Sequence, residues 1–349
     1  MKLLKPIVCA FAVGAVMPME LVGSSGVTRD YLNAQIKGAR TSVRIKVVDD
    51  DFTPVVGADV KALMGMMDPG QSYQVKGNTD NNGVFVLEGK TCGNEVLIEI
   101  SKCGYYGSVR KLCYIDIRAR HNVQDGKWQP WGAEERIVLR KIQKPVELKR
   151  QSVREFRKTA IINEWVGFDL ERNDFVAPGC KGKCADFDVR FVWDGKWLPD
   201  YTGMSVEIRF TQERAGGYWI VKNMESAFKG AYSAEKTAQY SVREMSFFEK
   251  VSKEDGRTFK HFEEDKSLIV RSRCVLDAQG ELVRANYASI NKLGFSCDKN
   301  GNASLYVMSV FNPTPNDTNL EDAETARLSR LGYRQQLEFE RRVEGKDAR

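Results

Sequence analysis

Segments in which apolar and polar side chains alternate recur along most of the chain. Residues 43–47, 189–193 and 206–210 have this period of two. Successive side chains of a β-strand point to opposite faces of a sheet, so the alternation predicts strands that bury one face. Asn-Gly turns within 79–83 and 299–302 separate further apolar segments, and this dipeptide is typical of hairpins. We therefore predict an all-β protein.

The predicted strands fall into two groups, residues 41–142 and residues 161–318. Each group is long enough to form a domain with its own core, so the pattern predicts two β-sandwich domains in tandem. Between them, residues 143–160 contain Pro145 and a series of basic side chains. We expect this segment to be a charged connector.

The first residues of the chain have a different pattern. Lys2 and Lys5 precede an uninterrupted apolar stretch at 6–19, and small residues follow at 23–26. A positive start, an apolar stretch and a small-residue exit are typical of a secretory signal peptide, which we assign to residues 1–24. The apolar stretch is shorter than the roughly 20 residues that cross a bilayer. We expect an exported protein, periplasmic, cell-surface or extracellular, with no transmembrane segment in the mature chain.

Two further segments flank the predicted domains. Residues 25–40 are polar and of mixed composition, so we expect a linker. Residues 319–349 are densely charged with scattered leucines, which predicts a short helical tail on the surface. A disordered tail is the alternative, because an isolated helix of this length is marginal in water.

The cysteine content takes its meaning from the predicted export. Eight cysteines are present, and Cys9 would leave with the signal peptide. In an oxidising compartment a cysteine usually pairs with another cysteine, and Cys180 and Cys184 are the favoured disulfide in the second domain. A Cys274–Cys297 pair is the alternative. A zinc site made by all four thiolates would depart from the usual C-x₂-C spacing, so we expect no metal.

Charge argues against one class of partner. The chain has 53 basic and 47 acidic residues, a net charge of +6. This small excess is spread along the sequence, whereas nucleic-acid-binding domains concentrate theirs on one face or along one helix. We expect no nucleic-acid partner.

Three short motifs in residues 41–142 share their order and spacing with a known family. They are Val47-Val48-Asp49…Pro54…Gly57-Ala58-Asp59-Val60, then Thr79-Asp80-x-x-Gly83-x-Phe85, then Ile98…Lys102-x-Gly104-Tyr105. With these motifs the region resembles a carboxypeptidase-regulatory-like (transthyretin-like) domain. The resemblance implies a Greek-key sandwich that serves as an accessory or cell-surface module without catalytic residues. The remainder of the chain resembles uncharacterised exported bacterial proteins, and that resemblance implies no activity.

Catalytic signatures are missing from the sequence. It contains two histidines, His121 and His261, and no HExxH, GxSxG, P-loop or dinucleotide-binding motif. We therefore expect no catalytic residues and no cofactor. The alternative is a secreted hydrolase that uses paired carboxylates of the second domain, because such pairs leave no sequence signature.

Tryptophans are the best candidates for ligand contacts. Trp193 and Trp197 flank a predicted tight turn, and Trp128 and Trp131 lie in a polar loop with Gly and Pro. Indole rings at such places stack on sugars or anchor protein partners. The alternative is that the rings close the ends of the two cores. We expect a non-catalytic binding or structural protein of the cell envelope or extracellular space, with a glycan or an envelope protein as its partner.

Overall fold

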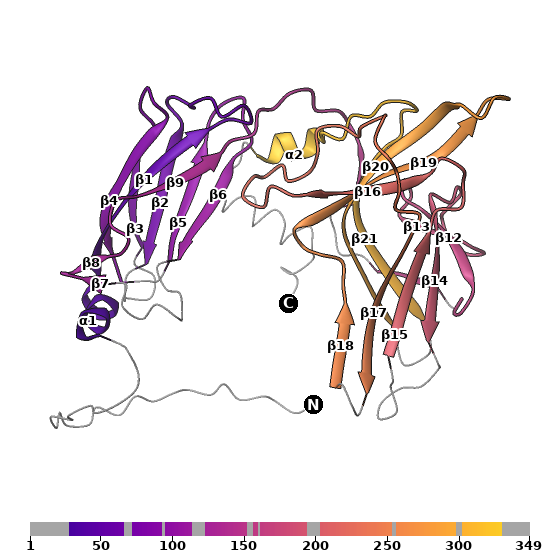
Figure 1. The fold of residues 1–349 in the computed structure, drawn as a ribbon, viewed down its shortest axis with the longest axis horizontal. Helices are drawn as coiled ribbons and strands as arrows, with labels where there is room; N and C mark the ends of the chain where they lie inside the picture. Colours follow the sequence, from indigo (N-terminus) through magenta and orange to yellow (C-terminus); the bar gives the residue numbers. More distant parts are fainter. Residues whose placement is uncertain are drawn as a thin grey trace.

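The structure, a computed structural model, has two β-rich lobes side by side (Figure 1). It describes residues 28–65, 72–92, 95–113, 123–151, 156–159, 161–193, 203–252, 256–297 and 302–329. The predicted signal peptide, Trp197 and residues 330–349 lie outside the described residues. The chain is all-β, with two sandwiches in tandem and a short C-terminal helix, so the predicted fold class is confirmed.

The first sandwich packs a five-stranded sheet on a four-stranded one. Its strands are β1 (Ala39–Val48), β2 (Asp59–Gly65), β3 (Ser72–Asn78), β4 (Val84–Thr91), β5 (Glu95–Ser101), β6 (Ser108–Cys113), β7 (Val123–Gln124), β8 (Lys127–Trp128) and β9 (Ala133–Val138). One sheet has the order β4-β1-β8-β7, with β9 also paired to β1, and the other has the order β3-β2-β5-β6. β1 is antiparallel to β4 and parallel to β9. Its alternating residues Val43, Ile45 and Val47 are buried in the core, as their period predicts.

Residues 25–40 are not the linker that their polarity suggested. Arg29–Lys37 form helix α1, and β1 already begins at Ala39. The Thr28 side chain caps the helix by accepting a hydrogen bond from the Tyr31 backbone N–H at 3.2 Å. Ala34 is buried in the first core. The helix therefore closes one end of the first sandwich. The Ala34 side chain is part of the core, and the Tyr31 ring packs against it.

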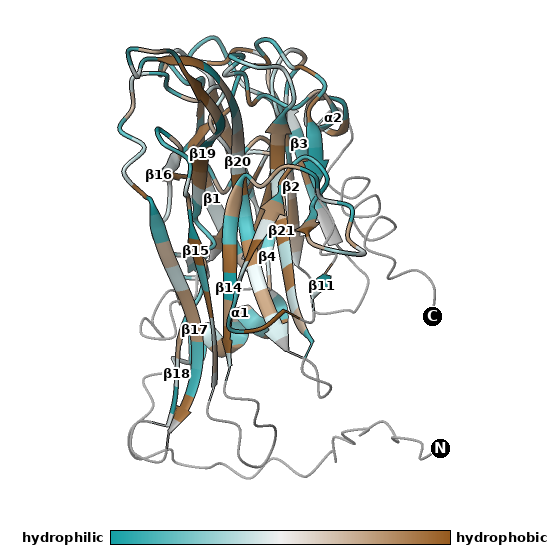
Figure 2. Ribbon diagram, turned by 90° about the vertical axis from the view of Figure 1, so that its right-hand side faces the viewer, coloured by the Kyte–Doolittle hydropathy of each residue, from teal (hydrophilic) through white to brown (hydrophobic). Residues whose placement is uncertain are grey.

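The second sandwich packs two six-stranded sheets. Its strands are β10 (Lys149–Gln151), β11 (Arg157–Thr159), β12 (Trp165–Asp169), β13 (Asp174–Val176), β14 (Phe187–Trp193), β15 (Gly203–Arg209), β16 (Gly216–Val221), β17 (Glu244–Ser252), β18 (Gly256–Lys260), β19 (Lys266–Leu276), β20 (Leu282–Cys297) and β21 (Ala303–Asn312). One sheet has the order β10-β21-β20-β19-β16, with β11 also on β21, and the other has the order β13-β12-β14-β15-β17-β18. Apolar and polar residues alternate strictly along β15, and hydrophobic and hydrophilic segments are mixed along strands such as β17 (Figure 2).

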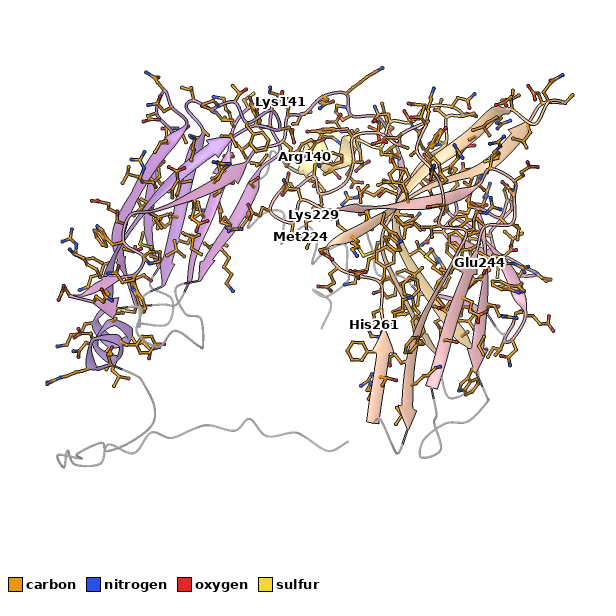
Figure 3. All side chains as sticks on the ribbon, in the orientation of Figure 1. Arg140, Lys141, Met224, Lys229, Glu244 and His261 are labelled. Atoms are coloured by element: carbon orange, nitrogen blue, oxygen red, sulfur yellow. The ribbon has the colours of Figure 1, made fainter. Side chains whose placement is uncertain are left out.

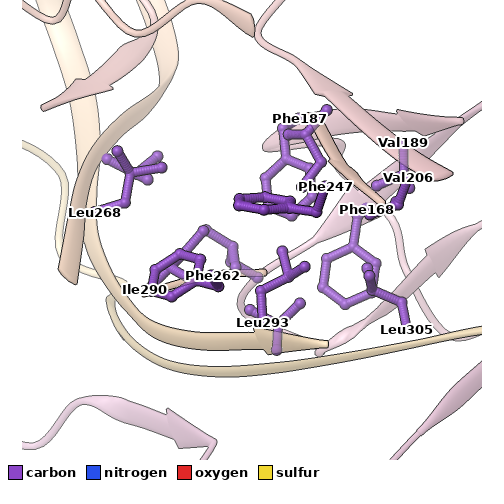
Figure 4. Close-up of a cluster of buried hydrophobic side chains, with 14 of the residues drawn as sticks. Phe168, Phe187, Val189, Val206, Phe247, Phe262, Leu268, Ile290, Leu293 and Leu305 are labelled. Carbon is purple, nitrogen blue, oxygen red and sulfur yellow. The ribbon is translucent and has the colours of Figure 1, made fainter. Parts of the chain in front are cut away.

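A large aromatic and aliphatic cluster lies between these two sheets (Figure 4). Phe168 stacks on Phe187 at 5.4 Å between ring centroids, and Phe247 lies 5.9 Å from Phe262. Each fully buried side chain of this kind contributes about 1.5–3 kcal/mol to the free energy of folding. The second domain therefore has a core independent of the first.

Part of the expected connector belongs to the second domain. Within residues 143–160, β10 and β11 both pair with β21 in antiparallel register. The side chains of β10, Lys-Arg-Gln, show no apolar alternation, because this strand is held by backbone hydrogen bonds at a sheet edge. A pattern of side chains cannot reveal such a strand.

The predicted C-terminal helix is short and is enclosed by protein on more than one side. Helix α2 (Ala323–Leu328) lies between the lobes (Figure 1), and both Leu320 and Glu321 are 1% exposed. Tyr106 of the first lobe stacks on Phe228 of the second at 4.9 Å, next to Ala326 of the helix. The described part of the predicted tail, up to residue 329, is therefore packed between the two domains. No helix in the described part of the chain is long and apolar enough to cross a membrane.

Candidate anion-binding pocket

A pocket of about 370 Å³ opens on the second sandwich where it meets α2. Its floor comes from β20 and β21, and its walls come from α2 and from the loop 222–231 that follows β16. We call it the lysine pocket after its charged lining, which consists of Arg150, Lys222, Lys229, Lys292, Glu264 and Asp322. A concave site with a few convergent polar groups in a partly apolar lining is the usual form of a small-ligand site.

A β-bulge provides two polar side chains to the floor. The register between β20 and β21 shifts between Ile290 and Lys292. Before the bulge Ile290 points into the core, and after it Leu293 does so. The consecutive residues Asn291 and Lys292 therefore both line the pocket. The change of phase from Ile290 to Leu293 is the sequence signal that indicates this site, and simple alternation does not reveal it.

Lys222 is the most constrained of the cations. Its Nζ donates hydrogen bonds to the backbone carbonyls of Glu264 and Asn291, each at 2.7 Å. An ammonium group has three N–H donors, so one remains for a ligand. Burial lowers the pKa of Lys222, and the positive charges of Lys229 and Lys292 lower it further. An anion in the pocket would oppose both effects.

The charges of the lining do not balance. Lys292 pairs with Glu264 at 3.2 Å, and Arg150 lies 3.8 Å from Asp322. Within the residues that the structure describes, Lys222 and Lys229 form no ion pair with a carboxylate. Lys222 and Lys229 thus line the pocket without an ion pair of their own in the described chain, although the nearby carboxylates of Glu264 and Asp265 act on Lys222 electrostatically.

Arg150 lies at the same wall and already has carboxylate partners. Its guanidinium lies 3.8 Å from the Asp322 carboxylate and 3.6 Å from that of Glu324, and its Nη1 atom is buried without a hydrogen-bond acceptor among the described residues. Because protein encloses this atom, it does not face the cavity. In the part of the chain that the structure describes, the two ammonium groups that line the cavity without an ion pair are therefore those of Lys222 and Lys229.

Hydrogen bonds within the loop 222–231, which carries Lys229, fix the shape of the loop. The Asn223 backbone N–H donates to the Lys229 carbonyl at 3.0 Å, and the Asn223 side chain accepts from the backbone N–H groups of Glu225 and Ser226, each at 3.2 Å. These bonds give the loop a defined shape, so Lys229 is presented on an ordered wall.

The first domain anchors this loop. Val109 N–H donates to the Glu225 carbonyl and Ala227 N–H to the Gly107 carbonyl, both at 2.9 Å. Arg110 also pairs with the Glu225 side chain. One wall of the lysine pocket is therefore positioned by contacts between the two domains.

Arg140 strengthens the same junction, and Figure 3 shows it with Met224 and Lys229 between the lobes. Its Nη1 donates to the Phe228 carbonyl at 3.0 Å and also to that of Gly230. The guanidinium lies 4.6 Å from the ring centroid of Phe228 and 4.2 Å from that of Tyr232, which is cation–π geometry. A buried arginine of the first domain thus orders the backbone beside Lys229.

The tryptophans of the first domain differ in exposure and do not form one open surface. Trp128 is 0% exposed, its Nε1 donates to the Thr91 carbonyl at 3.0 Å, and its ring packs edge-on against Tyr31. The prediction that it binds a ligand is therefore wrong, because β8 docks the ring into the core. Trp131 is half-buried under the cations of Arg40 and Lys127, at 5.5 and 5.1 Å.

The other tryptophan pair is only partly described. Trp193 is half-buried and packs against the second core, and its backbone N–H and carbonyl both bond to the Asn163 side chain. Trp197 lies outside the described residues. The packing of Trp193 therefore favours the alternative that its ring closes the end of the core, rather than a surface on which a sugar stacks.

The expected Cys180–Cys184 disulfide is not formed, and both thiols are free. The Asp169 carboxylate accepts the backbone N–H groups of Lys183 and Cys184 at 2.9 and 3.1 Å, so hydrogen bonds order this loop where a crosslink was expected. Burial raises the pKa of both thiols, which makes them poor nucleophiles.

Three carboxylates of the second domain surround an arginine. Arg273 pairs with Asp169 at 3.0 Å, with Glu171 at 2.6 Å and with Asp186 at 3.0 Å. Burial raises the pKa of Asp186, and the bond to Arg273 opposes this rise. These carboxylates neutralise a buried cation and accept backbone N–H groups, so the cluster is structural.

Comparison with known proteins identifies no family. No protein-family model and no curated protein matches the chain. Hydroxyquinol 1,2-dioxygenase from Pseudomonas putida DLL-E4 is 17% identical over 30% of this chain and 57% of its own, with a TM-score of 0.23. A streptococcal ancillary pilin is 11% identical over 80% of this chain and 61% of its own, with a TM-score of 0.20. The chain thus spans less than two thirds of both proteins, and these TM-scores are too low to support an inference about activity.

Proposed function

We propose that this chain is an exported binding protein without turnover, and that its second domain holds an anionic group of the ligand in the lysine pocket. The observation that carries the proposal is the pair of ammonium groups, Lys222 and Lys229, that border one cavity without a carboxylate partner in the described chain. Lys222 is half-buried and Lys229 is exposed at the rim, so a bound anion would supply a counter-charge to the first and a nearby attraction for the second. The other parts of the proposal rest on the sequence.

Export is proposed from the pattern of residues 1–24, and the first domain is proposed as an accessory module of the carboxypeptidase-regulatory-like type. In this scheme the first domain contacts no ligand. It holds the loop that carries Lys229 through the Val109 backbone N–H and the Gly107 carbonyl. The role of an accessory sandwich would then be to position a wall of its neighbour's site.

The test is a titration of the full chain with small anions, followed by NMR on selectively labelled lysines. We expect at least one of phosphate, acetate and glucuronate to shift the Lys222 and Lys229 signals in the millimolar range. The double variant Lys222→Ala/Lys229→Ala lacks both reporter lysines, so binding is compared between variants at Lys292, whose signal should shift in the natural chain and no longer shift in this variant. The matched control is Lys181→Ala/Lys183→Ala, two exposed lysines elsewhere on the second domain that change the net charge equally.

The control pair separates a site from a general charge effect. If both double variants weaken the shifts equally, or if none of the anions moves the Lys222 and Lys229 signals, the two lysines are ordinary solvated cations and the proposal is wrong. Retained shifts in the control and lost shifts in the pocket variant support it.

A further inference from the structure

We infer that the ligand of the lysine pocket is an acidic sugar, a hexuronate unit of a polysaccharide. This inference rests on the proposed function and narrows it. The lining combines the cations Lys222 and Lys229, the neutral amide of Asn291 and the apolar side chains of Met308 and Val310. A hexuronate has a carboxylate, several hydroxyl groups and a C–H face, which match these three kinds of lining group.

The orientation of Asn291 supports a neutral hydroxyl-bearing ligand. Its Oδ1 accepts hydrogen bonds from the hydroxyl groups of Ser267 at 2.8 Å and Ser289 at 3.1 Å. Because two donors fix the oxygen, the amide nitrogen is on the other side, with two N–H groups that have no acceptor in the described chain. These N–H groups suit the oxygens of a sugar hydroxyl or ring.

The apolar part of the lining argues against a simple phosphate. A free phosphate is best held by arginine forks and backbone N–H groups, and it leaves carbon surfaces unused. In the lysine pocket, however, Met308 and Val310 form part of the floor, and Met224, which belongs to the loop 222–231, is 48% exposed. Such surfaces gain energy only by covering a C–H face of the ligand.

Exposure at the rim favours a polymer over a free sugar. Lys229 and Met224 are both exposed, and both belong to the loop that walls the pocket. A chain of linked hexuronates could place one unit on the floor and a neighbouring carboxylate beside Lys229. The affinity should then rise with the number of linked units and fall with salt, because the cations involved are partly exposed.

The experiment is calorimetric titration of the full chain with three probes at one ionic strength: trigalacturonate, its fully methyl-esterified form, and inorganic phosphate. Esterification removes the charge and leaves the sugar frame, so it is the matched control ligand. We expect trigalacturonate to bind at least ten-fold more tightly than either of the others. Monomeric glucuronate should bind more weakly than trigalacturonate.

Two substitutions assign the contacts. Lys222→Ala should weaken trigalacturonate binding about ten-fold, and Met224→Ala should weaken it several-fold while leaving any phosphate binding unchanged. If phosphate binds as tightly as trigalacturonate and depends on the same lysines, the sugar inference is wrong and the anion pocket stands. If the esterified form binds equally well, or if no probe binds, the sugar inference fails together with the proposed function.

Discussion

The two sandwiches are built from similar strands and differ in how their irregular parts are used. In the first, α1 and the ring of Trp128 close an end of the core, and the polar end of that ring is satisfied by Thr91. In the second, a bulge in β20 and the loop 222–231 leave a cavity with unpaired cations. A β-sandwich can therefore have a filled end, as in the first domain, or a cavity, as in the second. The irregular segments, and not the regular strands, decide which of the two forms.

The largest expected effect tests whether the first sandwich is closed. Trp128→Ala would empty a fully buried site and remove the donor to the Thr91 carbonyl, and we expect a loss of about 3–5 kcal/mol in the free energy of unfolding. Denaturant unfolding followed by circular dichroism measures it. Trp131→Ala, which loses only cation–π contacts near the surface, should cost about 1 kcal/mol. Equal losses would contradict the closed-core description.

The next effect tests whether the first domain positions the open site of the second. Arg140→Ala removes charged hydrogen bonds to Phe228 and Gly230, each worth about 1.5–3 kcal/mol. Amide hydrogen exchange in the loop 222–231 should accelerate. Arg44→Ala is the control, because its pair with Glu134 spans 3.9 Å and both side chains are about half exposed. Unchanged exchange in Arg140→Ala would mean that the loop holds itself.

A smaller effect concerns the charge of Lys222. Because its pKa in the folded chain is lowered, the unfolded chain binds more protons between that lowered pKa and 10.5. The free energy of unfolding should therefore rise with pH across this window. Lys222→Met removes the titration, so the stability of the natural chain relative to this variant should increase from pH 7 to pH 10.5. Thermal melts at both pH values measure the difference, and a difference that shrinks would contradict the assignment.

The smallest expected effect concerns the thiols of Cys180 and Cys184. Both should be recovered as free thiols when the chain is unfolded without reductant, and Cys180→Ala should change the free energy of unfolding by less than about 1.5 kcal/mol. Peptide mapping under non-reducing conditions decides. A peptide that contains both cysteines and is lighter by two hydrogens would show that the Cys180–Cys184 disulfide, which we predicted from export, does form.

Alternation of side chains was enough to predict the class of the fold, because buried strand faces require it. It was not enough for β10, whose Lys-Arg-Gln sequence pairs through the backbone alone, or for the tight turn that buries Trp128. Glycine and proline near that ring predicted a surface loop. The parallel approach of β8 to β1, with Arg40 opposite Lys127, is a long-range contact that local composition does not encode.

The candidate site was harder to predict for the same reason. Its cations come from Arg150, the loop 222–231 and Lys292, which are brought together only when β21, β20 and α2 are in place. Each lysine alone is indistinguishable from a solvated one in the sequence. The tryptophans were predicted to contact a ligand because they lie near predicted turns and loops. In the structure, however, Trp128 and Trp193 pack against the two cores.

The parallel pairing of β1 with β9 has a mechanical consequence. Six residue pairs, from Val43–Ala133 to Val48–Val138, join the first and last long strands of the first sandwich. Because the two strands run in the same direction, the chain enters the domain at one end and leaves it at the other. A pull on both ends loads all of these hydrogen bonds in shear at once, whereas an antiparallel pair joined at adjacent ends would unzip bond by bond. The geometry of this pair should therefore make the first sandwich more resistant to a pull along the chain than an antiparallel pair would.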